Sequence, residues 1–368
     1  MSDTVQVTQA AKGIYIGDII FETEQDLIDF QTAGYTKVRG NVIVSGGEIT
    51  TLQKLDNLLT EINGSLRLEC STLTTLDGLY GLKTITDSLI IKDGDMTSFE
   101  GLRNLGTIGG NFKVIAESSY SYYYSLNSLS SFKGLSGLKS IGGDFEVNAK
   151  SYSSLNSLAS FEGLESLETI GGNFRVIAES SSSSSSSLNS LSSFKGLSGL
   201  KSIGGDFEVN AKSYSSLNSL ASFEGLESLE TIGGNFKVIA GSYSSLESLS
   251  SFKSLSGLKS IGGDFEVNAK SYSSLKSLAS FEGLESLTNI GGGKLTINYC
   301  SSLNNIDALK NIESLNDISI TECSKLYDFC VLKNVVQNMS GTFYVNDNGY
   351  NPTKYQLLNG ECSQIPQE

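Results

Sequence analysis

The sequence predicts a right-handed parallel β-solenoid of about twelve coils with a cap at each end. Three observations lead to this fold class. The chain repeats Ile-Gly-Gly-(Asn/Asp)-Phe-x-Val six times between residues 108 and 267, and once more in degenerate form. Equivalent residues of successive copies alternate in charge. Short apolar-x-apolar segments recur at steps of 23 to 33 residues. Such a pattern indicates an elongated array in which each unit contacts its neighbours.

The charge alternation predicts that equivalent residues lie side by side. Paired strands are about 4.8 Å apart, a distance at which like charges repel and opposite charges attract. The residue between Phe and Val changes sign at every copy: Lys113, Glu146, Arg175, Glu208, Lys237, Glu266. Three further columns do the same: Glu117, Lys150, Glu179, Lys212; then Lys133, Glu162, Lys195, Glu224, Lys253, Glu282; then Lys139, Glu168, Lys201, Glu230, Lys259. We expect structural charge ladders on the faces of the solenoid.

The predicted strands divide the chain into regular and expanded coils. Their cores begin at Val42, Leu66, Leu89, Phe112, Phe145, Phe174, Phe207, Phe236, Phe265, Leu295, Ile318 and Phe343. Each coil is expected to carry one short strand, an irregular return and a Gly-Gly corner. We interpret residues 1–40 as an N-terminal cap with a strand and a short helix, 41–111 as regular coils, 112–294 as expanded coils of a 62-residue double repeat, 295–322 as regular coils and 323–368 as a C-terminal cap.

Composition excludes several function classes. The net charge of −14 argues against nucleic acid, which calls for a basic surface. The chain has no histidine, so Ser-His-Asp and Cys-His catalysis and His-ligated metal sites are excluded. The alternating glutamates fit ladders better than a glycosidase pair. We therefore expect no enzyme, no cofactor and no metal. No apolar run is long enough to span a membrane, and Met1-Ser2-Asp3-Thr4 does not begin a signal peptide.

The insertions of the expanded coils are the best functional candidate. All follow the predicted strand and are rich in Ser and Tyr, so they should project from one edge of the solenoid. A Leu-x-x-Leu after each insertion suggests a second, smaller apolar seam. Tyrosines set in serine are typical of binding loops, because Tyr gives rigid contact area and Ser adaptable hydrogen bonds. The alternative is that the rings only cover the leucines. The candidate tyrosines are Tyr120, Tyr122, Tyr123, Tyr124, Tyr152, Tyr214, Tyr243 and Tyr272.

Four of the five cysteines form two pairs, each with two interpretations, and Cys70 is expected to be an inert inward-facing thiol. Cys300 and Cys323 lie five residues after Leu295 and Ile318, in equivalent slots where a side chain points inward, and Cys70 resembles the inward slot of an early coil. Buried thiols are expected there, although Cys300 and Cys323 would be close enough for a disulfide. Cys330 and Cys362 flank the C-terminal cap. A disulfide there would close a loop of about thirty residues and add roughly 3 kcal/mol in an oxidising compartment; free thiols are the alternative.

Three stretches of the sequence resemble receptor-L-domain-like leucine-rich repeat surface proteins of the Bacteroidota type. The segment from Gly17 to Val44 is similar to their N-terminal cap and first strand. The core Leu-x-Gly-Leu-x-x-Leu-x-x-Ile-Gly-Gly is similar to their repeat, and residues 326–362 to their C-terminal cap. The resemblance implies a leucine-rich-repeat-like parallel β-helix and a location at the cell surface or outside the cell. The long Ser/Tyr insertions depart from that pattern.

Two functions follow from these observations. The first is a non-catalytic surface binding or adhesion protein that presents its Ser/Tyr insertions to an extended glycan or surface protein, without nucleic acid or membrane insertion. Weak contacts repeated along a rigid rod would gain through multivalency. The alternative is a structural subunit or spacer of a surface layer, filament or outer-membrane complex, with lateral self-association through the projecting rows.

Overall fold

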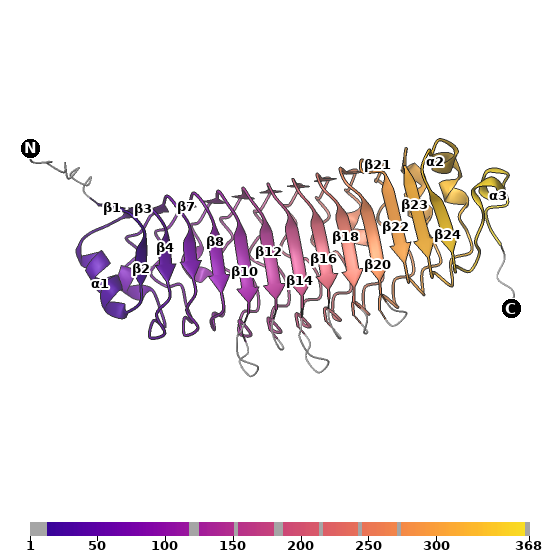
Figure 1. Cartoon of the computed structure of the whole chain (residues 1–368). Helices are drawn as coiled ribbons and strands as arrows, with labels where there is room; N and C mark the ends of the chain where they lie inside the picture. Colours follow the sequence, from indigo (N-terminus) through magenta and orange to yellow (C-terminus); the bar gives the residue numbers. More distant parts are fainter. Residues whose placement is uncertain are drawn as a thin grey trace, which may run out of the picture.

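The computed structural model describes residues 13–117, 125–150, 154–179, 187–212, 216–241, 245–270 and 274–364. Figure 1 shows an elongated, gently curved rod in which the strands lie side by side along its axis. Two parallel sheets lie along it, one of thirteen strands from β2 to β24 and one of eleven strands from β1 to β21, which is the architecture of a β-solenoid. The Tyr-containing segments predicted to bind ligand, residues 118–124, 151–153, 213–215, 242–244 and 271–273, lie outside the described residues, as does the serine-rich segment 180–186.

The larger sheet, called the major sheet here, has strands at all twelve predicted positions and at the predicted strand near residue 19. Every neighbouring pair in it is parallel. The apolar-x-apolar pattern explains these strands, because alternate side chains enter the core. In order they are β2 (Ile19–Phe21), β4 (Val42–Val44), β6 (Leu66–Leu68), β8 (Leu89–Lys92), β10 (Phe112–Ala116), β12 (Phe145–Ala149), β14 (Phe174–Ala178), β16 (Phe207–Ala211), β18 (Phe236–Ala240), β20 (Phe265–Ala269), β22 (Lys294–Asn298), β23 (Asp317–Thr321) and β24 (Phe343–Asn346).

The expectation of one strand per coil is wrong. A second sheet, the minor sheet, pairs a short strand from each of eleven returns, and from β9 to β19 its strands are Ser/Thr-Ile dipeptides that precede the Gly-Gly corners. Most of its strands have two residues, so they carry no alternation that a sequence pattern could reveal. In order they are β1 (Ile14–Ile16), β3 (Lys37–Arg39), β5 (Glu61–Ile62), β7 (Thr84–Ile85), β9 (Thr107–Ile108), β11 (Ser140–Ile141), β13 (Thr169–Ile170), β15 (Ser202–Ile203), β17 (Thr231–Ile232), β19 (Ser260–Ile261) and β21 (Asn289–Ile290).

Helices occur mainly at the ends of the rod (Figure 1). Helix α1 (Glu24–Thr32) begins with the predicted capping box, in which Thr23 accepts from the Asp26 amide and the Asp26 carboxylate accepts from the Thr23 amide. Its Leu27 and Phe30 are buried beside β2. At the other end lie α2 (Lys333–Gln337) and α3 (Lys354–Leu358). Single 3₁₀ turns mark some returns: Gln53–Leu55, Glu100–Leu102, Lys253–Leu255, Asp307–Asn311 and Cys330–Leu332.

Two stacks of phenylalanine rings fill the core of the expanded coils. One stack comes from the major sheet, where the rings of Phe207 and Phe236 are parallel with centroids 5.1 Å apart. The other comes from the returns, where Phe194 and Phe223 stack at 5.5 Å. The stacks also contact each other, as between Phe194 and Phe207 at 5.8 Å. These rings are fully buried, so each coil of the repeat contributes two large apolar side chains to one continuous core.

The Gly-Gly corners are required by close approach of neighbouring coils. The first glycine of each pair has no positive φ in the expanded coils, so backbone conformation is not the reason. A Cβ at Gly204 would lie 2.2 Å from the carbonyl oxygen of Gly171 in the preceding coil. The same distance is 2.0 Å between Gly142 and Gly109. Any side chain at this column would therefore push adjacent coils apart.

We expect Gly204→Ala to reduce the free energy of unfolding by about 1–3 kcal/mol, the usual cost of overpacking. The reason is that backbone, rather than a movable side chain, occupies the space of the added methyl group. Urea denaturation measures the change. Gly106→Ala is the matched control, because its Cβ would meet nothing closer than 3.8 Å. Equal stability of the two variants would contradict this account of the corners.

Candidate functional site

The six insertions leave and re-enter the solenoid in register. Each leaves just after the C-terminal end of one of the adjacent strands β10 to β20, where backbone bonds such as Lys150 N–H to Ala116 O (2.9 Å) and Lys212 N–H to Ala178 O (2.9 Å) align the departing residues. The re-entering residues are aligned as well, for example by Leu217 N–H to Ser187 O at 3.3 Å. With strands about 4.8 Å apart, the row of six starting points is about 24 Å long.

The predicted second apolar seam, formed by the Leu-x-x-Leu pairs after the insertions, is not found among the described residues. The Leu-x-x-Leu pairs do not form a separate seam, because both leucines of each pair are buried in the one main core. The first leucine of each pair, such as Leu188 and Leu217, has φ of 55°. This left-handed conformation is costly for leucine and is held by the complete burial of the side chain. Nothing in the sequence signals it. The predicted binding tyrosines, Tyr120 through Tyr272, lie outside the described residues.

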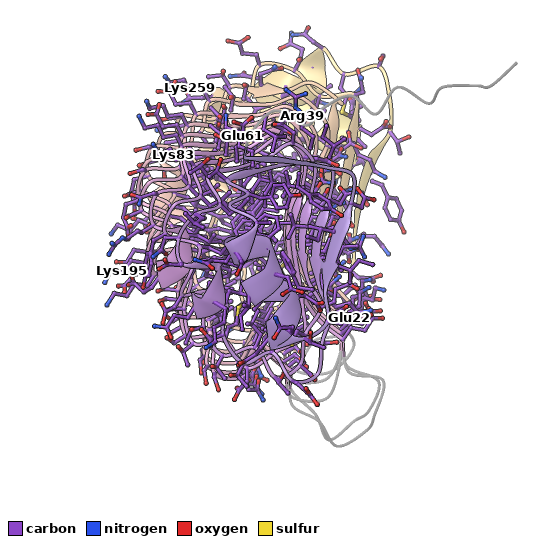
Figure 2. All side chains as sticks on the ribbon, turned by 90° about the vertical axis from the view of Figure 1, so that its left-hand side faces the viewer. Glu22, Arg39, Glu61, Lys83, Lys195 and Lys259 are labelled. Atoms are coloured by element: carbon purple, nitrogen blue, oxygen red, sulfur yellow. A yellow bond between two sulfur atoms is a disulfide. The ribbon has the colours of Figure 1, made fainter. Side chains whose placement is uncertain are left out.

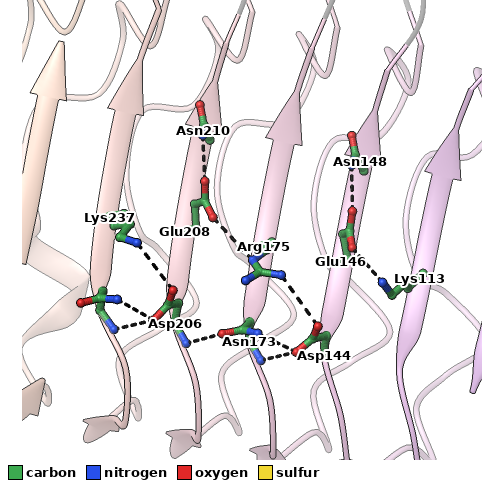
Figure 3. Close-up of polar contacts among 11 residues, drawn as sticks. Lys113, Asp144, Glu146, Asn148, Asn173, Arg175, Asp206, Glu208, Asn210 and Lys237 are labelled. Carbon is green, nitrogen blue, oxygen red and sulfur yellow. Dashed lines mark hydrogen bonds and ion pairs between the residues drawn. The ribbon is translucent and has the colours of Figure 1, made fainter. Parts of the chain in front are cut away.

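The main charge ladder is aligned as predicted. The strand register pairs Lys113 with Glu146, Glu146 with Arg175, and so on to Glu266. Figure 3 shows the ion pairs in this column. Lys113 Nζ lies 3.3 Å from Glu146 Oε2, and Arg175 Nε lies 3.5 Å from Glu208 Oε2. Lys237 instead pairs with Asp206 of the adjacent column, at 3.6 Å.

A polar column that the sequence analysis did not single out supports this ladder. At the residue before each phenylalanine, asparagine and aspartate alternate, and each side-chain oxygen accepts the backbone N–H of the next coil. Asn173 N–H donates to Asp144 Oδ1 at 2.8 Å, and Asp206 N–H donates to Asn173 Oδ1 at 2.8 Å (Figure 3). The Asn/Asp alternation was visible in the repeat, but its role depends on the distance between coils.

We expect Glu208→Lys to lower the melting temperature, and to do so more at low ionic strength. The change places three cations side by side, at positions 175, 208 and 237, and removes the acceptor of Asn210 Nδ2 (2.8 Å). Exposed pairs contribute about 0–1 kcal/mol each and are screened by salt. Thermal melting at two salt concentrations measures the effect. Glu208→Gln is the control, because it keeps an acceptor without adding a cation. A salt-independent loss would contradict electrostatic repulsion as its cause.

The other predicted ladders also contain ion pairs. Figure 2 shows Lys195 and Lys259 on the side of the rod away from the strands of the major sheet. Lys195 Nζ lies 2.7 Å from Glu162, and Lys259 Nζ lies 2.7 Å from Glu230. The hydrogen bond from Lys195 lowers the pKa of Glu162, and that from Lys259 lowers the pKa of Glu230. Any stability from these pairs is present above the unfolded carboxyl pKa and is lost as pH falls through the lowered folded value.

A groove of about 710 Å³ crosses five successive returns on this side. One glycine from each of four coils lines it, between ladder residues such as Lys195 and a column that includes Glu165 and Glu227. Three of its carboxylates have partners: Glu162 pairs with Lys195, Glu165 accepts from the Gly163 amide at 2.9 Å, and Glu227 accepts from the Gly225 amide at 3.0 Å. Both signs of charge therefore alternate along the groove, as expected for structural ladders.

The cysteines follow the sequence interpretations. Cys330 and Cys362 form a disulfide with Cα atoms 4.8 Å apart. Cys70, Cys300 and Cys323 are buried free thiols, so the alternative Cys300–Cys323 disulfide is not present. The Cys70 thiol contacts the carbonyl oxygens of Gly46 and Ile49, as the inward slot predicts. A hydrogen bond with Cys323, together with burial, raises the pKa of the Cys300 thiol.

Within the described parts of the chain, no three His, Cys, Asp or Glu side chains gather where a metal ion could be held. Nor does a search of those residues find a helix that is long and apolar enough to cross a bilayer. No family model, curated protein or solved structure matches this chain.

Proposed function

We propose that this protein is a non-catalytic binding or adhesion protein of the cell surface, which presents its Ser/Tyr-rich insertions as a row to an extended glycan or surface protein. The proposal includes a right-handed solenoid of about twelve coils, closed by α1 at one end and by the disulfide-linked segment at the other. The resemblance to receptor-L-domain-like repeat proteins supports the surface location, as does a disulfide, which persists in oxidising compartments.

The observation that carries the proposal is the register of the insertion points. The residues just before and just after the insertions are aligned by backbone hydrogen bonds between neighbouring coils. Segments of similar composition therefore start at equal spacing along one edge of a rigid sheet. A ligand with its own repeat can contact several of them at once, and linked weak contacts raise avidity without any new chemistry.

Replacing the tyrosines of the first insertion tests this function. In the variant Tyr122→Ser/Tyr123→Ser/Tyr124→Ser, we expect attachment to glycans or surface proteins on an array to fall while the circular dichroism spectrum is unchanged. Tyr344→Ser/Tyr355→Ser is the control, because both rings are exposed, at 52% and 75%, and lie away from the row. Unchanged attachment of the triple variant, or an equal loss in the control, would reject the binding function.

Lateral assembly into a surface layer or filament is the second candidate, favoured by the exposed ladders. Lys195 and Glu162 have side chains 61% and 50% exposed, within a column that changes sign at each coil. A column of this kind is complementary to a copy of itself shifted by one coil. Assembly predicts that the mass measured by light scattering grows with concentration and falls with added salt. A monomeric mass at all concentrations would reject it.

A further inference from the structure

One of the charge columns is interrupted at a single position. The residues directly after β10 to β20 are Glu117, Lys150, Glu179, Lys212, Gly241 and Lys270. Backbone bonds keep the column aligned through the interruption: Gly241 N–H donates to Ala211 O at 2.7 Å, and Lys270 N–H donates to Ala240 O at 3.0 Å. A glutamate is therefore replaced by glycine between two lysines, whose Cα atoms are about 10 Å apart, two strand spacings.

The intact part of the edge shows what such lysines do with a carboxylate. Glu117 Oε2 lies 3.9 Å from Lys92 Nζ and 3.8 Å from Lys150 Nζ, so one carboxylate lies between the lysines of the two flanking coils. Lys212 still has Glu179 on one side, at 3.3 Å. Lys270 has no ion pair among the described residues. At the interrupted position, therefore, one lysine of the ladder keeps a single carboxylate partner and the other has none among the described residues.

A cavity of about 390 Å³ lies at the interruption. Lys212, Gly241 and Lys270 line it together with Asn210, Ile239, Glu266 and Asn268. Asn210 is 7% exposed and donates through Nδ2 to Glu208, while its side-chain oxygen has no hydrogen-bond partner among the described residues. Figure 3 shows this oxygen pointing away from Glu208, toward the C-terminal end of the strand. The oxygen is itself buried, and a buried acceptor without a donor is costly, so a rotation of the side chain toward the cavity would let a ligand hydroxyl satisfy it.

We propose that the cavity at Gly241 binds a sugar carboxylate, such as a uronic acid residue of an acidic glycan. The carboxylate takes the place of the missing glutamate between Lys212 and Lys270. The Asn210 side chain rotates toward the cavity so that a hydroxyl of the ring donates to its Oδ1, and Ile239 contacts the apolar face of the ring. The assignment rests on the proposed binding function and specifies its ligand class, but it uses none of the tyrosines.

The charges of the cavity favour a hydroxylated monoanion over other ligands. Two lysines and Glu266 line the cavity in a chain whose net charge is −14, and because Lys212 already pairs with Glu179 at 3.3 Å, Lys270 is the cation that the ligand carboxylate would neutralise. Glu266 accepts from Asn268 Nδ2 at 3.0 Å, and carboxylates can accept further bonds from ligand hydroxyls. A neutral sugar would leave Lys270 without a counter-ion, and a simple carboxylate such as acetate would leave the Asn210 oxygen without a donor.

The chain contains a matched control for this site. Asn148 has the same arrangement as Asn210: it is 4% exposed, donates to a glutamate, Glu146, at 2.8 Å, and its side-chain oxygen has no partner among the described residues. Its coil, however, ends in Lys150, which lies in the uninterrupted part of the column between Glu117 and Glu179. Lys150 thus has a glutamate of the column on each neighbouring coil, whereas Lys270 has Gly241 on the preceding coil.

Titration of the intact protein with a glucuronic acid tetrasaccharide and with the matching glucose tetrasaccharide, followed by ligand-observed NMR, tests the proposal. We expect the acidic sugar to bind more tightly than the neutral one. Lys270→Gln should weaken the binding about tenfold or more, the effect of losing one charge-assisted hydrogen bond, whereas Lys150→Gln should leave it unchanged. Equal binding of the two sugars, no binding of the acidic one, or equal effects of the two lysine variants would overturn the proposal.

Restoring the ladder gives a second test. Gly241→Glu supplies the missing carboxylate and should abolish glucuronate binding. A Cβ at Gly241 would lie 2.8 Å from the Lys212 carbonyl oxygen, so Gly241→Ala controls for the local backbone shift and should weaken binding less. Equal effects would overturn the proposal. The triple tyrosine variant should keep glucuronate binding here, since its segment follows β10; failure of this site and failure of the proposed function are therefore distinguishable.

Discussion

Replacing Phe207 by alanine should reduce the free energy of unfolding by about 3–5 kcal/mol, the usual loss for a buried ring. Phe207 is fully buried. Its ring stacks on Phe236 and also contacts Phe174, at centroid distances of 5.1 and 5.5 Å. The neighbours belong to adjacent coils whose backbones are hydrogen-bonded in register, so they cannot collapse into the space left behind. Urea denaturation followed by circular dichroism measures the loss.

Phe207→Leu is the matched control, because the chain itself places leucine in this column at Leu66, Leu89 and Leu295. We expect it to lose clearly less stability than Phe207→Ala. If both variants lost the same amount, ring stacking rather than filled volume would explain the effect. If the alanine variant lost less than about 1 kcal/mol, the continuous phenylalanine core would not hold the expanded coils together.

The second large effect concerns the Cys330–Cys362 disulfide. In oxidising buffer, the variant Cys330→Ser/Cys362→Ser should lose about 3 kcal/mol, because the bond restricts the unfolded C-terminal segment. The backbone bond from Phe329 N–H to Cys362 O, at 2.9 Å, would remain. Since each coil contacts mainly its neighbours, melting should begin at this end. Hydrogen exchange of residues 326–364 measures the local opening.

A reducing agent should destabilise the wild-type protein to the same extent and leave the double variant unaffected. Cys323→Ala provides the comparison, because it removes a buried free thiol and keeps the disulfide. The difference in unfolding free energy between this variant and the wild type should therefore be the same with and without the reducing agent. A wild-type protein whose C-terminal segment is insensitive to reduction would contradict a stabilising role for the disulfide.

The major sheet could be predicted because its signals are local and repeated. The pattern Phe-x-Val gave the strands, and the charge alternation at Lys113 to Glu266 gave their register, since only side-by-side residues make alternation favourable. The minor sheet could not be predicted in this way. A strand such as Ser202–Ile203 has one inward and one outward residue, so it carries no periodicity, and it forms because the corners on either side hold it beside its neighbours.

The candidate sites also differ in how much of each could be predicted from local sequence signals. Tyr122 and its companions are conspicuous in sequence, but where they lie depends on segments outside the described residues. Gly241 stands in a column of alternating Glu and Lys, so the interruption was visible in the sequence. Its consequence was not, because the cavity and the Asn210 oxygen without a partner arise only when three coils are stacked. The same holds for the positive φ of Leu217.

The central claim, a rigid solenoid whose repeated insertions bind one extended ligand, is tested most directly by removing one double repeat. Deleting residues 145–206 joins Asp144 to Phe207 and preserves the Asp-Phe sequence and the charge alternation from Lys113 to Glu208. Binding of both proteins to a glycan and surface-protein array would be compared, with light scattering as a check on mass. We predict a folded protein with the same ligand and lower avidity. Unchanged avidity, or no specific binding by the intact chain, would contradict the account.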